Sequence, residues 1–329
     1  MFVLGFPLGA MSVLMIHGLT GGRWGVVMRA PLRAIVATLP LALALLLPLL
    51  FRPDLIFPWA APDPAGLPDT VRLKLAYLNL PFFLLRFVVY AAAWLILAWL
   101  VLKGTDEKSR LDGKTSALGL VIHAFAIAVF STDWMLSLEP DFTSTIYALL
   151  EASAQIVGAS ALALFVLAVT RSIEALPGGD SRTALGEDVA NMLFGFMLTW
   201  AYLAFMQWVI IWAGDLPDDI RWYMLRSENG WQHLLLLLVL VHFVAPFAGF
   251  LIRDVKRSHR GLLWLAAALL AGHFADVAWR IRPPLADDAA VWPDLAAFAA
   301  VGGLWLGGFL FARAHPQTLF LLRRRAVDG

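Results

Sequence analysis

Ionisable side chains are rare in the long apolar stretches of this chain, and those found there could carry protons. Glu151 is the most informative, because Tyr147, Gln155 and Gly158 lie at helical spacings around it and share its face. A charged group inside a bilayer costs roughly 2.5–3.5 kcal/mol, so it needs a partner, water or a function. Glu151 is therefore expected to be a proton carrier or a ligand to a quinol hydroxyl, or else to form an ion pair with Arg86.

Asp276 and His273 form a second group, and Arg280 follows on the same helical face. The pair predicts either a proton relay, since a carboxylate fixes the tautomer of an imidazole, or a hydrogen bond that only holds helices together. Asp133 is expected nearer the membrane surface. A solvated or helix-terminal carboxylate is the alternative to a functional role for it.

The remaining candidates are single residues in other apolar stretches. Arg86 is followed by Tyr90 one turn later, and His242 is a relay candidate, whereas His123 and His17 are weaker and lie in the other half of the membrane. His242 and His273 could approach the geometry of a bis-His haem b. The paired histidines on single helices that stacked haems need are missing, so the sequence disfavours haem.

The composition is that of a membrane protein. Of 329 residues, 60% are hydrophobic and 15% are charged, whereas soluble domains carry about 25% charged residues. A net charge of +1 gives no indication of nucleic-acid binding. The chain has no cysteine, which excludes disulfides, thiolate-ligated iron–sulfur clusters and covalent haem c from it.

The predicted fold is all-α, a polytopic transmembrane helical bundle that forms one integral membrane domain over residues 1–329. Nine segments approach the roughly 20 apolar residues that a helix needs to span a bilayer. They lie near residues 1–20, 31–51, 77–102, 115–137, 143–170, 189–214, 231–252, 260–280 and 290–312. Glu151 then lies about 12 Å inside its span, at about 1.5 Å per residue.

The orientation follows from lysine and arginine, which cytoplasmic connections retain. One set of alternate connections carries Arg23, Arg29, Arg33, Lys103, Lys108, Arg110, Lys114, Arg171, Arg182, Arg253, Lys256, Arg257, Arg260, Arg313, Arg323, Arg324 and Arg325. The other carries Arg52, Arg72, Lys74, Arg221, Arg226, Arg280 and Arg282. The richer side is expected in the cytoplasm with the C-terminus. Met1 would then lie outside, and a further helix before it is expected.

Several stretches resemble the ActF-type membrane subunit of alternative complex III, a bacterial quinol:electron-acceptor oxidoreductase, within the NrfD/PsrC-like membrane proteins. The stretches are HGLTGGRWGVVMR (residues 17–29), AYLNLPFFLLR (76–86), STDWMLSLEPDFTSTIY (131–147), LTWAYLAFMQWVIIWAGDLPDDIRWYMLR (198–226) and GWQHLLLLLVLVHFVAPF (230–247). Together they run through most of the chain.

The resemblance implies a core of two four-helix bundles with peripheral helices, in the bacterial cytoplasmic membrane. It also implies a homologous quinol-binding membrane subunit and iron–sulfur and haem c subunits as partners, with no cofactor of its own except possible quinone or quinol. The family pattern has ten spans, and Met1 falls inside what resembles the second of them.

The leading hypothesis is a subunit of a quinol-oxidising respiratory complex that contributes a proton-conducting half-channel in its outer half and anchors partners. The alternatives are a quinone-binding subunit, with His242 or His273 as hydrogen-bond partner, and a structural scaffold. A secondary transporter would show broken helices and inverted repeats, which the sequence does not.

Overall fold

The computed structural model describes residues 1–315 except 62, 64–65, 68, 107–108, 174–178 and 286–291, and the side chains of 179–183 and 293 are also outside the described part. Lys108, Arg323, Arg324, Arg325 and the side chain of Arg182, which count toward the predicted orientation, therefore lie outside it. Within the described residues the regular elements are all helical, and nine helices are long and apolar enough to cross a membrane. The prediction of a polytopic helical membrane protein is confirmed at this level.

The spans are formed by the following elements: α1 (Phe2–Thr20); α2 (Arg23–Val36), α3 (Leu39–Ala44) and α4 (Leu47–Leu50) in series; α6 (Leu80–Gly104); α7 (Gly113–Trp134); α8 (Tyr147–Val169); α9 (Gly179–Gly214); α11 (Trp231–Leu238), the π-helix η5 (Val239–Val244) and α12 (Ala245–Leu251) in series; α14 (His259–Ile281); and α15 (Trp292–Ala314). Short helices connect them: η1 (Pro53–Leu55), η2 (Pro58–Ala60), α5 (Asp69–Arg72), η4 (Leu136–Leu138), α10 (Pro217–Leu225), α13 (Arg253–Arg257) and η6 (Pro283–Leu285).

Several predicted boundaries were wrong, for local reasons. The second span begins at Arg23 rather than residue 31, and prolines near the starts of α3 and α4 divide it into three helices. The third begins at Leu80, since the Asn79 side chain caps it by accepting a hydrogen bond from the Phe82 N–H at 3.1 Å. The fifth begins at Tyr147. Glu151 is consequently only four residues, about 6 Å, from its helix end.

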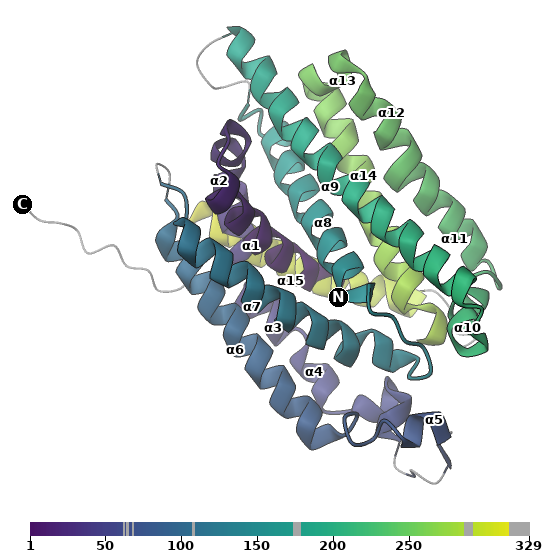
Figure 1. The fold of residues 1–329 in the computed structure, drawn as a ribbon. Helices are drawn as coiled ribbons and strands as arrows, with labels where there is room; N and C mark the ends of the chain where they lie inside the picture. The colour runs from purple at the N-terminus through teal and green to yellow at the C-terminus, as the bar shows by residue number, and fades with distance from the viewer. Residues whose placement is uncertain are drawn as a thin grey trace, which may run out of the picture.

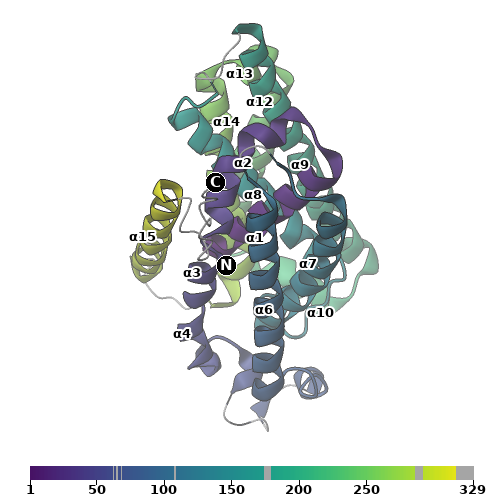
Figure 2. The ribbon, with the colours of Figure 1, turned by 90° about the vertical axis from the view of Figure 1, so that its left-hand side faces the viewer.

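Helix α8 occupies the centre of the bundle. It packs against α1, α7, α9 and α14. In Figure 1, α6 and α7 lie on one side of it, and α11 to α14 lie on the other. Figure 2 shows α15 along a separate side, where it contacts α1, α2 and α3 and where the Trp305 indole donates to the Thr38 hydroxyl at 2.9 Å. The division into two four-helix bundles stays a prediction.

Contacts between connections support the predicted alternation of the two ends. On the end with more lysine and arginine, Arg23 pairs with Asp188 at 2.9 Å and Arg257 pairs with Glu187 at 2.7 Å. On the other end, the Thr143 N–H donates to the Asp219 carboxylate at 3.1 Å. Residues assigned to one side from the sequence thus meet on one side of the bundle.

Two helix backbones approach each other closely where α1 crosses α8. A Cβ on Gly9 would lie 2.0 Å from the Gln155 carbonyl oxygen, and one on Gly5 would lie 3.3 Å from the Gln155 side chain. Gly5 and Gly9 are four residues apart, the small-residue spacing that brings membrane helices into backbone contact. This crossing holds the polar face of α8 against α1.

Replacing Gly9 by Ala should therefore destabilise the protein by about 1–3 kcal/mol, because backbone atoms cannot move aside as a side chain can. Gly195→Ala is the matched control, since a Cβ there has nothing within 4 Å and alanine favours helix. Unfolding in mixed micelles with increasing dodecyl sulfate measures both. Equal stabilities for the two variants would contradict this description of the crossing.

Candidate functional site

Arg280 binds two carboxylates from two helices in the interior of the bundle. Its Nη1 donates to Glu151 Oε2 at 2.6 Å, and its Nη2 donates to Asp276 Oδ2 at 2.7 Å. The three side chains are between 2% and 4% exposed. Gln155 completes this group, here called the Arg280 cluster, by donating from Nε2 to Glu151 Oε1 at 2.8 Å.

Helical spacing positions each member of the Arg280 cluster. Glu151 and Gln155 are one turn apart on α8, and Asp276 and Arg280 are one turn apart on α14, so each helix presents an adjacent polar pair. The packing of α8 on α14 brings the two pairs together. Tyr147 flanks the cluster, with the Arg280 guanidinium carbon 5.8 Å from its ring centre.

The Arg280 cluster contains more carboxylates than cations. With both carboxylates ionised, it carries a net charge of −1 in an apolar interior, where unpaired charge is costly. One bound proton makes it neutral.

A second buried arginine connects the cluster to the end of the bundle. Arg226, 1% exposed, donates from Nη2 to the Arg280 carbonyl at 2.7 Å and to Glu139 Oε2 at 2.6 Å. Its guanidinium stacks on Trp222, 3.6 Å from the ring centre. Sequence reasoning counted Arg226 only as a loop charge, and Glu139 was not singled out. Their place in the DWMLSLEP and WYMLR stretches was the only available signal.

Arg86 and Asp133 form a separate pair between α6 and α7. Arg86 Nε donates to both Asp133 oxygens at 3.0 Å, and Nη2 lies 2.8 Å from Oδ1. The Tyr77 carbonyl accepts a further bond at 2.9 Å, and the guanidinium lies over the Tyr77 ring at 3.8 Å. This pair has one charge of each sign.

The Arg86 and Asp133 contacts correct two expectations. Arg86 does not pair with Glu151, because Asp133 on the neighbouring α7 holds it and Arg280 holds Glu151. Asp133 is also not a solvated carboxylate, since its side chain is 0% exposed. It does lie near a helix end, as expected.

His273 and Asp276 do not form the expected relay pair. Asp276 accepts from Arg280, and neither ring nitrogen of His273 has a hydrogen-bonding partner among the described residues. The His273 ring instead lies against Gly158, where an added Cβ would come within 2.6 Å of the imidazole. The centroids of the His273 and Phe2 rings are 5.3 Å apart. Glycine at 158 therefore makes room for the imidazole behind the Arg280 cluster.

His242 lies in the π-helix η5. Within the described residues neither of its ring nitrogens has a partner in hydrogen-bond geometry, although the Leu269 carbonyl is close. The His242 ring is packed edge-on against the Trp200 ring, with the ring centroids 4.4 Å apart. It also lies against Gly272, where an added Cβ would be 2.3 Å from His242 Nδ1. A π-helical turn widens the helix locally and occurs frequently at functional sites. His242 and His273 are thus fully buried imidazoles.

The two candidates of the other membrane half are remote from the cluster and already bonded. The Trp94 indole donates to His123 Nδ1 at 3.1 Å, which makes this nitrogen an acceptor. His17 Nε2 bonds the Gly22 carbonyl at 3.1 Å beside Trp24. Tyr90, next to Arg86 in sequence spacing, accepts from the Trp134 indole at 2.6 Å. Among the described residues, no three His, Asp or Glu side chains gather as ligands for a metal ion.

Comparison with models of known protein families gives no match to this chain, and comparison with curated proteins gives none either.

Replacing Arg280 by Leu should cost about 3–5 kcal/mol of stability, because it leaves two buried carboxylates without a counter-charge. Glu151→Gln should cost much less, since it leaves one guanidinium with one carboxylate. Unfolding in mixed micelles gives both values, with Arg52→Leu as a control that breaks an exposed pair with Asp54 and should change little. A loss in Glu151→Gln as large as in Arg280→Leu would refute the two-to-one charge balance.

Proposed function

We propose that this chain is a membrane subunit of a quinol-oxidising respiratory complex of the alternative complex III type, and that its Arg280 cluster binds and releases protons. The two-to-one ratio of buried carboxylates to guanidinium is the observation that carries the proposal. A cluster that is charged without a proton and neutral with one can exchange that proton at modest cost. The Arg86–Asp133 pair has equal charges and serves as a structural tie.

The position of the Arg280 cluster supports release toward one surface. Glu151 lies four residues from the start of α8, and Arg280 is one residue from the end of α14. Arg226 and Glu139 continue from Arg280 to the end of the bundle, where Glu139 is partly exposed. By the distribution of lysine and arginine, that end faces away from the cytoplasm. A quinol-oxidising partner would release its protons on that side.

A half-channel describes this arrangement better than a continuous path. Behind the cluster, His273 and His242 are fully buried, and their ring nitrogens make no hydrogen bond in the described part of the chain. Toward the other surface, His123 and His17 are bonded to Trp94 and the Gly22 carbonyl. The resemblance of the stretches at 131–147 and 198–226 supports the assignment to a respiratory complex with quinol-binding, iron–sulfur and haem c partners, in the bacterial cytoplasmic membrane with the C-terminus inside.

The assignment to a complex is tested by isolation under mild detergent. A tagged chain expressed in its own cell should bring with it a second membrane subunit and chains that carry haem c and iron–sulfur clusters, identified by spectra and mass spectrometry. Isolation of the chain alone, with quinol oxidation intact in the chain's absence, would refute it.

In the isolated complex, Glu151→Gln and Asp276→Asn should each lower quinol turnover and the coupled release of protons by about tenfold or more, because removing a proton-transfer group typically costs two orders of magnitude. Asp218→Asn removes an exposed carboxylate on α10 and is the control. Subunit content and thermal stability should be unchanged in all three. Wild-type turnover in both cluster variants would favour a scaffold.

A further inference from the structure

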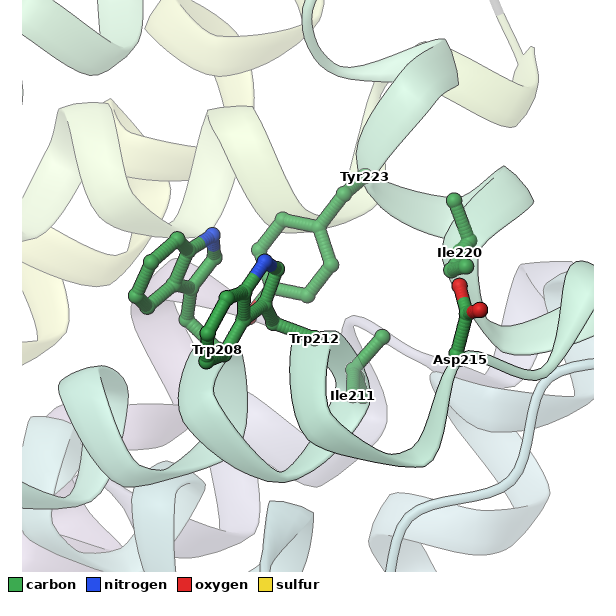
Figure 3. Close-up of a pocket in the computed structure, with 6 residues that line it drawn as sticks. All are labelled: Trp208, Ile211, Trp212, Asp215, Ile220 and Tyr223. Carbon is green, nitrogen blue, oxygen red and sulfur yellow. The ribbon is translucent and has the colours of Figure 1, made fainter.

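A pocket of about 410 Å³ opens between α9 and α10. It is lined by Trp208, Ile211, Trp212, Asp215, Ile220 and Tyr223. Figure 3 shows the two indoles side by side on α9, the Tyr223 ring behind them and the Asp215 carboxylate at the other side of the pocket. The sequence indicated only that this region lies near a membrane surface.

We propose that this pocket binds an organic ammonium group, and that the headgroup of an amine-bearing phospholipid supplies it. Aromatic faces attract cations, and three aromatic side chains beside one carboxylate are the combination that recognises alkylammonium ions. The volume of the pocket is near the lower end of the roughly 300–1,000 Å³ typical of small-ligand sites.

Contacts with neighbouring rings hold the aromatic side chains of the pocket in place. The Trp208 and Trp212 rings are one helical turn apart and nearly parallel, at 9° with centroids 5.9 Å apart. The Tyr223 ring packs against the rings of Trp222 and Trp279, with centroid distances of 4.8 Å and 6.2 Å. These contacts hold Tyr223 against the core. Trp212 is 69% exposed and Trp208 45%, so both present ring surface to a ligand.

Asp215 is placed in a backbone conformation that glycine would adopt more easily. Its φ is +50°, in the left-handed region, at the point where α9 ends. No hydrogen bond or ion pair of its carboxylate is found in the described part of the chain. The carboxylate is therefore available to a cation that enters the pocket.

The charge around the pocket selects against anions. Asp215 is the charged residue among those that line the pocket. Arg226 is bound to Glu139, and Arg221 does not line the pocket. The polar groups of the described lining residues are the Asp215 carboxylate, the Tyr223 hydroxyl and two indole N–H groups, so Asp215 supplies the charge that a ligand meets. A membrane-surface position with this charge suits the ammonium of a zwitterionic lipid.

Native mass spectrometry in detergent can test the proposal with two lipids of identical chains, phosphatidylethanolamine and phosphatidylglycerol. The wild-type protein should retain phosphatidylethanolamine preferentially. Asp215→Asn should lower that retention at least threefold, and asparagine also tolerates the left-handed backbone, so only charge is removed. Trp212→Leu should have a similar effect. Asp218→Asn and Trp292→Leu are the controls, since Trp292 is also 69% exposed.

Competition with tetramethylammonium identifies the source of the ammonium group. Selective lipid retention that depends on Asp215 supports the lipid headgroup. Binding of tetramethylammonium that depends on Asp215, without selective lipid retention, supports the same site with a soluble cation as ligand. Equal retention of the two lipids without tetramethylammonium binding, or equal effects of Asp215→Asn and Asp218→Asn, would overturn the proposal.

Discussion

Arg280 holds Glu151 and Asp276 together in a region that is otherwise apolar, and the packing of the central helices depends on this arrangement. Bringing charges out of water is costly, and it is tolerable only where partners are close and well oriented. The close packing of α8 on α14, and of α1 on α8 at Gly9, supplies that orientation. A helix that shifted by one residue would turn Glu151 away from its cation.

The bundle contains two kinds of buried ionic contact with different consequences. Arg86 and Asp133 balance each other, and aromatic rings over the guanidinium exclude water, so this pair favours a single fixed state. The Arg280 cluster has one carboxylate in excess, so its charge depends on whether a proton is bound. Behind it, His242 and His273 are packed against glycines, and their ring nitrogens make no hydrogen bond within the described residues. The proposed function rests on this contrast.

The sequence was sufficient to predict the membrane-spanning helices and to predict which polar residues share one face of a helix. Apolar length identified the membrane helices, and helical spacing placed Glu151 with Gln155 and Asp276 with Arg280. Partners across helices could not be derived, because spacing gives a face but not the neighbour it meets. Arg86 was thus named as one alternative partner for Glu151, and Arg226, which is deeply buried, was counted as a loop charge. The start of α8 was missed because residues 143–146 are Thr, Ser, Thr and Ile, with no Gly or Pro to mark a boundary. A hydrogen bond from the Thr143 N–H to the Asp219 carboxylate holds this segment outside the helix.

Infrared spectroscopy of the protein at neutral pH tests the central claim most directly, because a protonated carboxylic acid has a carbonyl band that an ionised one lacks. The charge excess in the Arg280 cluster predicts one such band, lost in both Glu151→Gln and Asp276→Asn and retained in Asp133→Asn. A spectrum without a protonated acid, or a band that survives both cluster substitutions, would contradict the account.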